Sequence, residues 1–168
     1  MLKEHPFFPP TDFLSMDQFA GDNGLPMGFA YPHDSPTSPE GFLVECPGEV
    51  FPVVLLSIQD CPAETQEVDP SNYIDGAEIP MWLLHGLSDP LLPFNQALVV
   101  YEATTAEGNE ARLTLVPGAG HDVGQVLAGT NATTWVTNRG GQETVTDGRS
   151  PTWDDIEHFI HVNLSRGR

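Results

Sequence analysis

The sequence predicts an α/β fold of parallel strands with flanking helices, and three consecutive segments carry that prediction. Residues 79–85 form a short, continuous apolar run, which is typical of a parallel strand buried on both faces. From Pro93 to about Glu107 apolar residues recur at helical spacing, and Gly108-Asn109 is a typical helix end. Residues 111–116 then alternate between apolar and polar side chains, as a strand does. Strand, helix and strand at this spacing indicate a βαβ unit with two parallel strands.

The region before this unit, residues 1–78, is predicted to be a loop-rich excursion with short helices. Proline and glycine are abundant there, especially before residue 50, and both interrupt regular structure. One short helix should begin at Thr11 or Asp12, either of which can cap it. Two more are expected over residues 49–58 and 62–68, each with a proline near its start.

The region after the unit is predicted to hold an insertion and a final helix. Residues 129–149 form the insertion, with a possible hairpin around residues 138–141, and a surface excursion is favoured over a rim for a substrate site. The last helix should span residues 150–165, with Ser150 as its cap, Pro151 at its first position and acidic residues in its first turn.

The charge of the chain restricts its partners. Six Lys and Arg residues stand against 24 Asp and Glu residues, which gives a formal net charge of −18. Because nucleic acids and anionic membrane surfaces attract cations, the sequence predicts neither as a partner. We interpret the many acidic residues as surface groups that keep the protein soluble, and adaptation to high salt is the alternative interpretation. No run approaches the roughly 20 apolar residues of a membrane span.

The chain has two cysteines, Cys46 and Cys61, on either side of a stretch rich in Pro and Gly. Their spacing would close a short loop, so a disulfide is favoured over two unpaired thiols. A disulfide would imply an oxidising compartment, and sequons at Asn131 and Asn163 add weak support for secretion. The compartment stays open, with a secreted or extracytoplasmic location slightly favoured.

Two residues that can carry chemistry follow the two predicted parallel strands. Asp89 lies just after the first strand and His121 just after the second. Ligands of open parallel sheets bind at the carboxyl ends of the strands, so both side chains should emerge at one edge. A carboxylate there can accept the imidazole Nδ1 proton, which leaves the other nitrogen as a general base toward a serine. Asp122, adjacent to His121, is the weaker candidate for the acid.

The flanking residues make the pair more specific. Residues 85–93, His-Gly-Leu-Ser-Asp-Pro-Leu-Leu-Pro, resemble the HGxxDxxVP acid turn of α/β-hydrolase esterases, above all the feruloyl-esterase-like and prolyl-oligopeptidase-like branches. Residues 117–121, Pro-Gly-Ala-Gly-His, are similar to the histidine turn of these enzymes. Residues 7–14 resemble the piece after their sixth strand, and residues 69–74 resemble the lead-in to their acid strand. The resemblance covers about residues 7–128.

The resemblance implies the carboxyl-terminal part of an α/β-hydrolase parallel sheet, an incomplete sheet within one partial domain. Residues 79–128 would supply the acid strand, a helix and the histidine strand. Asp89 would be the triad acid and His121 the triad base of a serine enzyme that hydrolyses small-molecule carboxylic esters through an acyl-enzyme. Hydrolysis of peptide bonds is the alternative within the enzyme class. No cofactor or metal is expected; His158 and His161 share a helix face but have no third ligand nearby.

The nucleophile of the family is missing from this sequence. It would sit in a G-x-S-x-G elbow before residue 7, and no serine of the chain lies between glycines at that spacing. The chain alone is therefore expected to be inactive. It is interpreted as part of a longer hydrolase, with a non-catalytic binding protein and one chain of a split enzyme as alternatives. An unpaired edge of the incomplete sheet would favour association.

Overall fold

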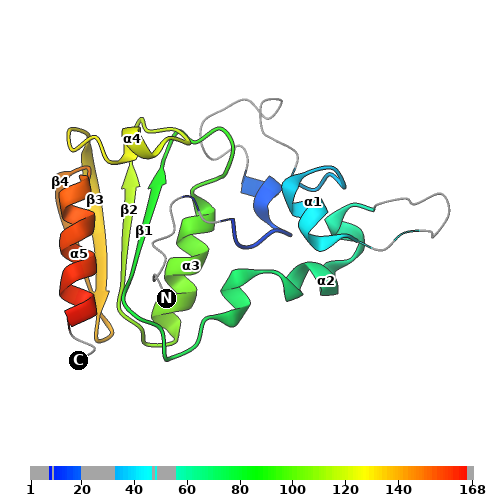
Figure 1. The fold of residues 1–168 in the computed structure, drawn as a ribbon, viewed down its shortest axis with the longest axis horizontal. Helices are drawn as coiled ribbons and strands as arrows, with labels where there is room; N and C mark the ends of the chain where they lie inside the picture. The colour runs from blue at the N-terminus through cyan, green and yellow to red at the C-terminus, as the bar shows by residue number, and fades with distance from the viewer. Residues whose placement is uncertain (1–7, 9, 20–32, 47, 49–55, 166–168) are drawn as a thin grey trace.

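The computed structural model describes residues 8, 10–19, 33–46, 48 and 56–165, and Figure 1 shows their arrangement. Short helices come first, a four-stranded sheet follows, and two longer helices flank the sheet. In chain order the elements are η1 (Met16–Phe19), α1 (Pro39–Val44), η2 (Ile58–Asp60), α2 (Pro62–Glu67), η3 (Pro70–Tyr73), β1 (Met81–Gly86), α3 (Asn95–Ala106), β2 (Ala111–Val116), α4 (Val123–Val126), β3 (Ala132–Arg139), β4 (Gln142–Arg149) and α5 (Trp153–Ser165).

The βαβ unit predicted from the sequence is present. β1 and β2 are parallel and pair along their whole length, from Met81 opposite Ala111 to Gly86 opposite Val116. The helix α3 connects them and ends near Gly108, which has a φ of +80°. The α/β class is therefore confirmed.

The prediction of a parallel sheet is wrong beyond this first pair. The strand order is β1-β2-β3-β4, and both β2–β3 and β3–β4 are antiparallel, so the sheet is mostly antiparallel. The reason is the expected hairpin: Gly140 and Gly141 have φ values of +59° and +77°, which allow a two-residue turn between β3 and β4. The hairpin then adds β3 to the open edge of β2 and extends the sheet.

The side chains of the strands alternate between two apolar layers. Trp82, Leu84 and Val116 belong to one core cluster together with Ile156 of α5. Leu83 and Leu113, which point to the opposite face, belong to a second cluster with residues of α3. The two longer helices therefore cover opposite faces of the sheet, and in Figure 1 the short helices α1 and α2 lie beyond α3.

The last helix begins later than expected and has a different cap. Thr152 is the residue that caps α5: the Asp155 N–H approaches its hydroxyl at 3.4 Å, and the Asp155 carboxylate accepts the Thr152 N–H at 2.8 Å. Ser150 is buried instead and exchanges hydrogen bonds with Asn131 at the base of the hairpin. These bonds hold Ser150 at the base of the hairpin, so the cap of α5 is Thr152.

The first third of the chain agrees with the predictions only in part. The expected helix at residues 62–68 is present as α2. Thr11 does not cap a helix, because it is buried and hydrogen-bonds to Gln96 of α3. Most of the helix expected over residues 49–58 lies outside the described residues.

The disulfide between Cys46 and Cys61 is confirmed. It joins the segment just after α1, two residues beyond Val44, to the residue before α2. Among the helices in the described part of the chain, none is long and apolar enough to cross a membrane.

Candidate active site

Asp89 is fully buried in the turn that follows β1. One of its carboxylate oxygens, Oδ1, accepts the N–H groups of Leu91 at 2.8 Å and Leu92 at 3.0 Å. Aspartate before proline favours such turns, because its side chain can bind the backbone N–H groups that follow. This local structure fixes the carboxylate and leaves its other oxygen, Oδ2, for partners from elsewhere.

Two imidazoles meet Asp89 Oδ2. The Nδ1 atom of His121 lies 2.8 Å away and the Nε2 atom of His85 lies 3.2 Å away. His85 Nε2 is also 3.1 Å from the carbonyl oxygen of Leu92, so both of its neighbours are acceptors and this nitrogen must carry the hydrogen. The structure thus brings together the two predicted site residues and adds His85, a buried donor to the carboxylate.

The surroundings of Asp89 favour its ionised form. Burial raises its pKa, but hydrogen bonds from His85, from the backbone of Leu92 and Leu91, and from His121 lower it by more. The net pKa of Asp89 lies below its usual value. The carboxylate is therefore charged at neutral pH and accepts the Nδ1 hydrogen of His121, which leaves Nε2 with its lone pair.

His121 is held in place while its ring stays accessible. The acid turn and the histidine turn are tied together by the Ser88 N–H, which donates to the carbonyl of Ala119 at 2.9 Å. The Phe8 ring packs on the His121 ring with a centroid distance of 4.6 Å. The His121 side chain is 34% exposed, and no described residue hydrogen-bonds to its Nε2 atom. A general base of this kind needs such an open nitrogen.

No nucleophile accompanies this base within the described residues. All eight serines of the chain are described, and none of their hydroxyls hydrogen-bonds to His121. Ser88 is the closest of them in sequence to Asp89, but it is exposed on the acid turn, and its hydroxyl has no hydrogen bond to either imidazole among the described residues. The described part of the chain therefore holds an acid and a base without a nucleophile.

The remaining candidates of the sequence analysis have other local surroundings. Asp122 caps α4, and its carboxylate accepts the N–H of Gln125 at 3.0 Å. His158 and His161 lie on α5, and the described residues contain no group of three or more His, Cys, Asp or Glu side chains that could hold a metal ion.

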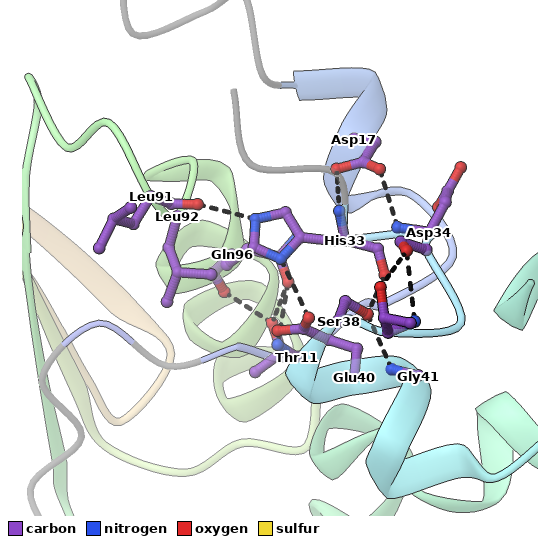
Figure 2. Close-up of polar contacts among 12 residues, drawn as sticks. Thr11, Asp17, His33, Asp34, Ser38, Glu40, Gly41, Leu91, Leu92 and Gln96 are labelled. Carbon is purple, nitrogen blue, oxygen red and sulfur yellow. Dashed lines mark hydrogen bonds and ion pairs between the residues drawn. The ribbon is translucent and has the colours of Figure 1, made fainter. Parts of the chain in front are cut away.

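A second buried pair, His33 and Glu40, contacts the acid turn, and no pattern in the sequence predicts it. Figure 2 shows the His33 ring between α1 and the acid turn. Its Nε2 atom lies 2.7 Å from the carbonyl oxygen of Leu91, and its Nδ1 atom lies 3.2 Å from Glu40 Oε2. Both side chains are less than 10% exposed, at 6% and 8%. A histidine in a loop carries no motif that predicts a contact with a turn so distant in sequence.

The pKa values of His33 and Glu40 are shifted in opposite directions. Burial lowers the pKa of His33, but the hydrogen bonds with Glu40 and Leu91 and the charges of Glu40 and Asp17 raise it above the usual value. Burial raises the pKa of Glu40, but His33 and nearby hydrogen bonds bring it below the usual value. The stabilisation that protonated His33 gives to the fold is therefore lost as the pH rises through the pKa of His33 in the folded protein. The stabilisation that ionised Glu40 gives is lost as the pH falls through the pKa of Glu40 in the folded protein.

We expect His33→Ala to lower the free energy of unfolding by about 3 kcal/mol near pH 5.5, because it leaves the Glu40 carboxylate buried without its partner. The usual pKa values of the two groups are 4.5 for Glu40 and 6.5 for His33, and between these pH values both groups contribute fully to stability. The loss of stability in the variant should therefore be largest in this range and should shrink in alkali. Urea denaturation over a pH series measures it, with the exposed His161→Ala as control. A loss that grows with pH would contradict this account.

We expect Gly86→Ala to destabilise the protein by about 3 kcal/mol, the upper range for overpacking. A Cβ atom at Gly86 would lie 2.6 Å from the carbonyl oxygen of Gly120 and closer still to that of Ala119, both in the histidine turn. Urea denaturation gives the loss. Gly76→Ala is the matched control, because its new Cβ would meet nothing closer than the Glu107 carbonyl oxygen at 3.4 Å. Equal stability of the two variants would show that the turns do not approach as closely as described.

Comparison of the chain with protein-family models and with curated proteins gives no match.

Proposed function

We propose that this chain supplies the acid and the base of a serine hydrolase that acts on carboxylic esters through an acyl-enzyme. Asp89 is the proposed acid, His121 the proposed base, and the nucleophilic serine comes from outside residues 1–168. The observation that carries the proposal is the 2.8 Å contact between Asp89 Oδ2 and His121 Nδ1 at the carboxyl edge of the parallel pair. The sequence resemblance of both turns to those of α/β-hydrolase esterases supports it.

In the proposed reaction His121 moves a proton twice. Its Nε2 atom takes the proton of the serine hydroxyl as the serine oxygen attacks the ester carbonyl, and it returns that proton to the alcohol that leaves. Water then attacks the acyl-enzyme while His121 takes a proton from it. His121 passes this proton to the serine oxygen as the bond to the acyl group breaks and the acid is released. Asp89 stays ionised throughout, holds the Nδ1 hydrogen and stabilises the imidazolium.

The finer form of the fold is part of the same proposal. We infer that β1 and β2 are the end of a larger parallel sheet whose other strands come with the nucleophile. β1 supports this, because among the described strands it lies at the edge of the sheet and yet five of its six residues are buried. On its open edge the Phe8 N–H donates to the Leu84 carbonyl at 3.3 Å. The rest of such an edge is suited to pairing with a further strand.

The test uses an extended polypeptide, which is expressed from the native gene with the coding sequence directly upstream of Met1 included. We expect it to hydrolyse 4-nitrophenyl esters of short acids and residues 1–168 alone not to do so, because a triad without its serine loses several orders of magnitude in rate. Peptide 4-nitroanilides, assayed in parallel, address the alternative of a serine peptidase. Preferential turnover of the anilides would replace the ester assignment by the peptidase one.

A second candidate is a binding protein that keeps the hydrolase site without its chemistry. The absence of a nucleophile beside His121 among the described residues favours it. It predicts that neither the chain nor the extended polypeptide turns over esters or anilides. The ester proposal fails if that is the result.

A further inference from the structure

Arg112 lies far from the candidate active site, at the opposite end of the parallel strands. It is the second residue of β2, whereas Asp89 and His121 follow the carboxyl ends of β1 and β2. Its side chain points to the face that α5 covers, where its strand neighbour Trp82 also lies. Nothing in the proposed reaction uses this residue.

Three aromatic rings surround the Arg112 guanidinium. Its central carbon lies 4.8 Å from the ring centroid of Trp82, 5.3 Å from that of Trp135 and 5.6 Å from that of Phe159. Such contacts stabilise a cation but supply no hydrogen-bond acceptor. The Nε atom is buried and has no hydrogen-bond partner among the described residues. Arginine has five donors, so this position leaves a strong donor group unused.

The described residues include three arginines and no lysine, and the other two arginines have acidic partners. Arg139 Nε lies 3.1 Å from Glu110, and Arg149 binds Asp155 at 2.8 Å. Arg112 is the one described arginine without an ion pair, in a chain of net charge −18. Burial and the neighbouring Arg139 lower its pKa, and Asp155 opposes them only in part, which agrees with an incompletely compensated cation.

A cavity of about 300 Å³ opens beside this guanidinium, between α5 and the sheet. Arg112 and Arg139 give it a positive wall, while Trp135, Phe159 and Val162 give it an apolar one. Asp155 also borders the cavity, but its carboxylate is bound by Arg149 and by Thr152. A site of this size with one unpaired cation and aromatic walls fits a small organic anion.

We propose that this cavity binds a small organic monocarboxylate, with its carboxylate on Arg112 and its flat apolar body against Trp135 and Phe159. A single charge matches the one uncompensated guanidinium. A second negative charge, as on phosphate, would meet Asp155. Of the other described groups that line the cavity, Arg139 is already paired with Glu110 and His158 is not a permanent cation. This inference is independent of the proposed hydrolase function.

The test is a titration of the purified chain with benzoate, followed by tryptophan fluorescence. Trp82 and Trp135 stack on Arg112 and should report binding, so the exposed Trp153 is first replaced by phenylalanine to remove its signal. We expect saturable binding of benzoate and a higher melting temperature. Benzamide, which has the same shape without the charge, should bind at least about tenfold more weakly.

Two variants assign the binding to Arg112. Arg112→Gln should weaken benzoate at least about tenfold, and Arg112→Lys, which keeps the charge but not the planar fork, should also weaken it. Circular dichroism checks that each variant is folded; if Arg112→Gln does not fold, the lysine variant and the benzoate–benzamide pair decide. Equal affinities for benzoate and benzamide, unchanged affinity in a folded variant, or tighter binding of phosphate than of benzoate would overturn the proposal.

Discussion

Replacing His121 with alanine is expected to lower kcat of the extended polypeptide on an ester by on the order of 10⁶-fold, because no other base can take the serine proton. His85 cannot replace it, since its Nε2 atom already donates to Asp89 and to the Leu92 carbonyl in a fully buried position. The assay is hydrolysis of a 4-nitrophenyl ester at saturating substrate. The matched control is His161→Ala, an exposed histidine of α5 that should leave kcat unchanged.

The loss must come from chemistry and not from unfolding. Without the His121 ring Asp89 still accepts hydrogen bonds from His85 and from the N–H groups of Leu91 and Leu92. We therefore expect His121→Ala to keep the fold, with a melting temperature within several degrees of the original. A folded His121→Ala variant that retains more than a small fraction of the activity would remove His121 from the proposed role.

Replacing Asp89 with asparagine is expected to lower kcat by about 10⁴-fold through the tautomer of His121. Asparagine would present an NH₂ group where Oδ2 now accepts, because Oδ1 is committed to the two backbone N–H groups. His121 would then turn its Nδ1 lone pair toward that NH₂ group and carry its hydrogen on Nε2, where a base needs a lone pair. Asp122→Asn is the matched control, because the neighbouring side chain caps α4 and should not affect kcat.

The stability of Asp89→Asn separates this effect from a structural one. The pKa of Asp89 is below its usual value of 3.8, so its contribution to stability is present above that pH and is lost as pH falls through the folded pKa. The variant should be less stable than the original protein at neutral pH, and the difference should shrink in acid. Activity is therefore compared at a temperature where both proteins are folded. Full ester hydrolysis by folded Asp89→Asn would contradict the assignment of the acid.

The sequence predicts the local elements around the site well because their signals are local. The apolar run before Asp89, the helical spacing after Pro93 and the alternation of residues 111–116 each reflect one element, and β1, α3 and β2 follow them closely. Asp89 and His121 meet because two parallel strands end at the same edge of a sheet, which topology alone requires.

Other features of the molecule depend on contacts that no local pattern reports. The orientation of the outer strands depends on which edge the hairpin joins, and β3 joins β2. The pairs of His33 with Leu91 and of Arg112 with three aromatic rings join distant segments or different elements. Ser150 and Thr152 have similar capping ability, so the sequence does not show which of them caps α5. In the structure Ser150 is bound to Asn131, and Thr152 is the cap.

The most direct test of the proposed acid and base is to label the extended polypeptide with a fluorophosphonate, which reacts with serines activated by a histidine. We expect a single labelled serine outside residues 1–168. Its labelling should disappear in His121→Ala and fall strongly in Asp89→Asn, and Asp122→Asn should be labelled as strongly as the original protein. Absence of labelling in the extended polypeptide, or labelling that persists in folded His121→Ala, would contradict the proposed acid and base.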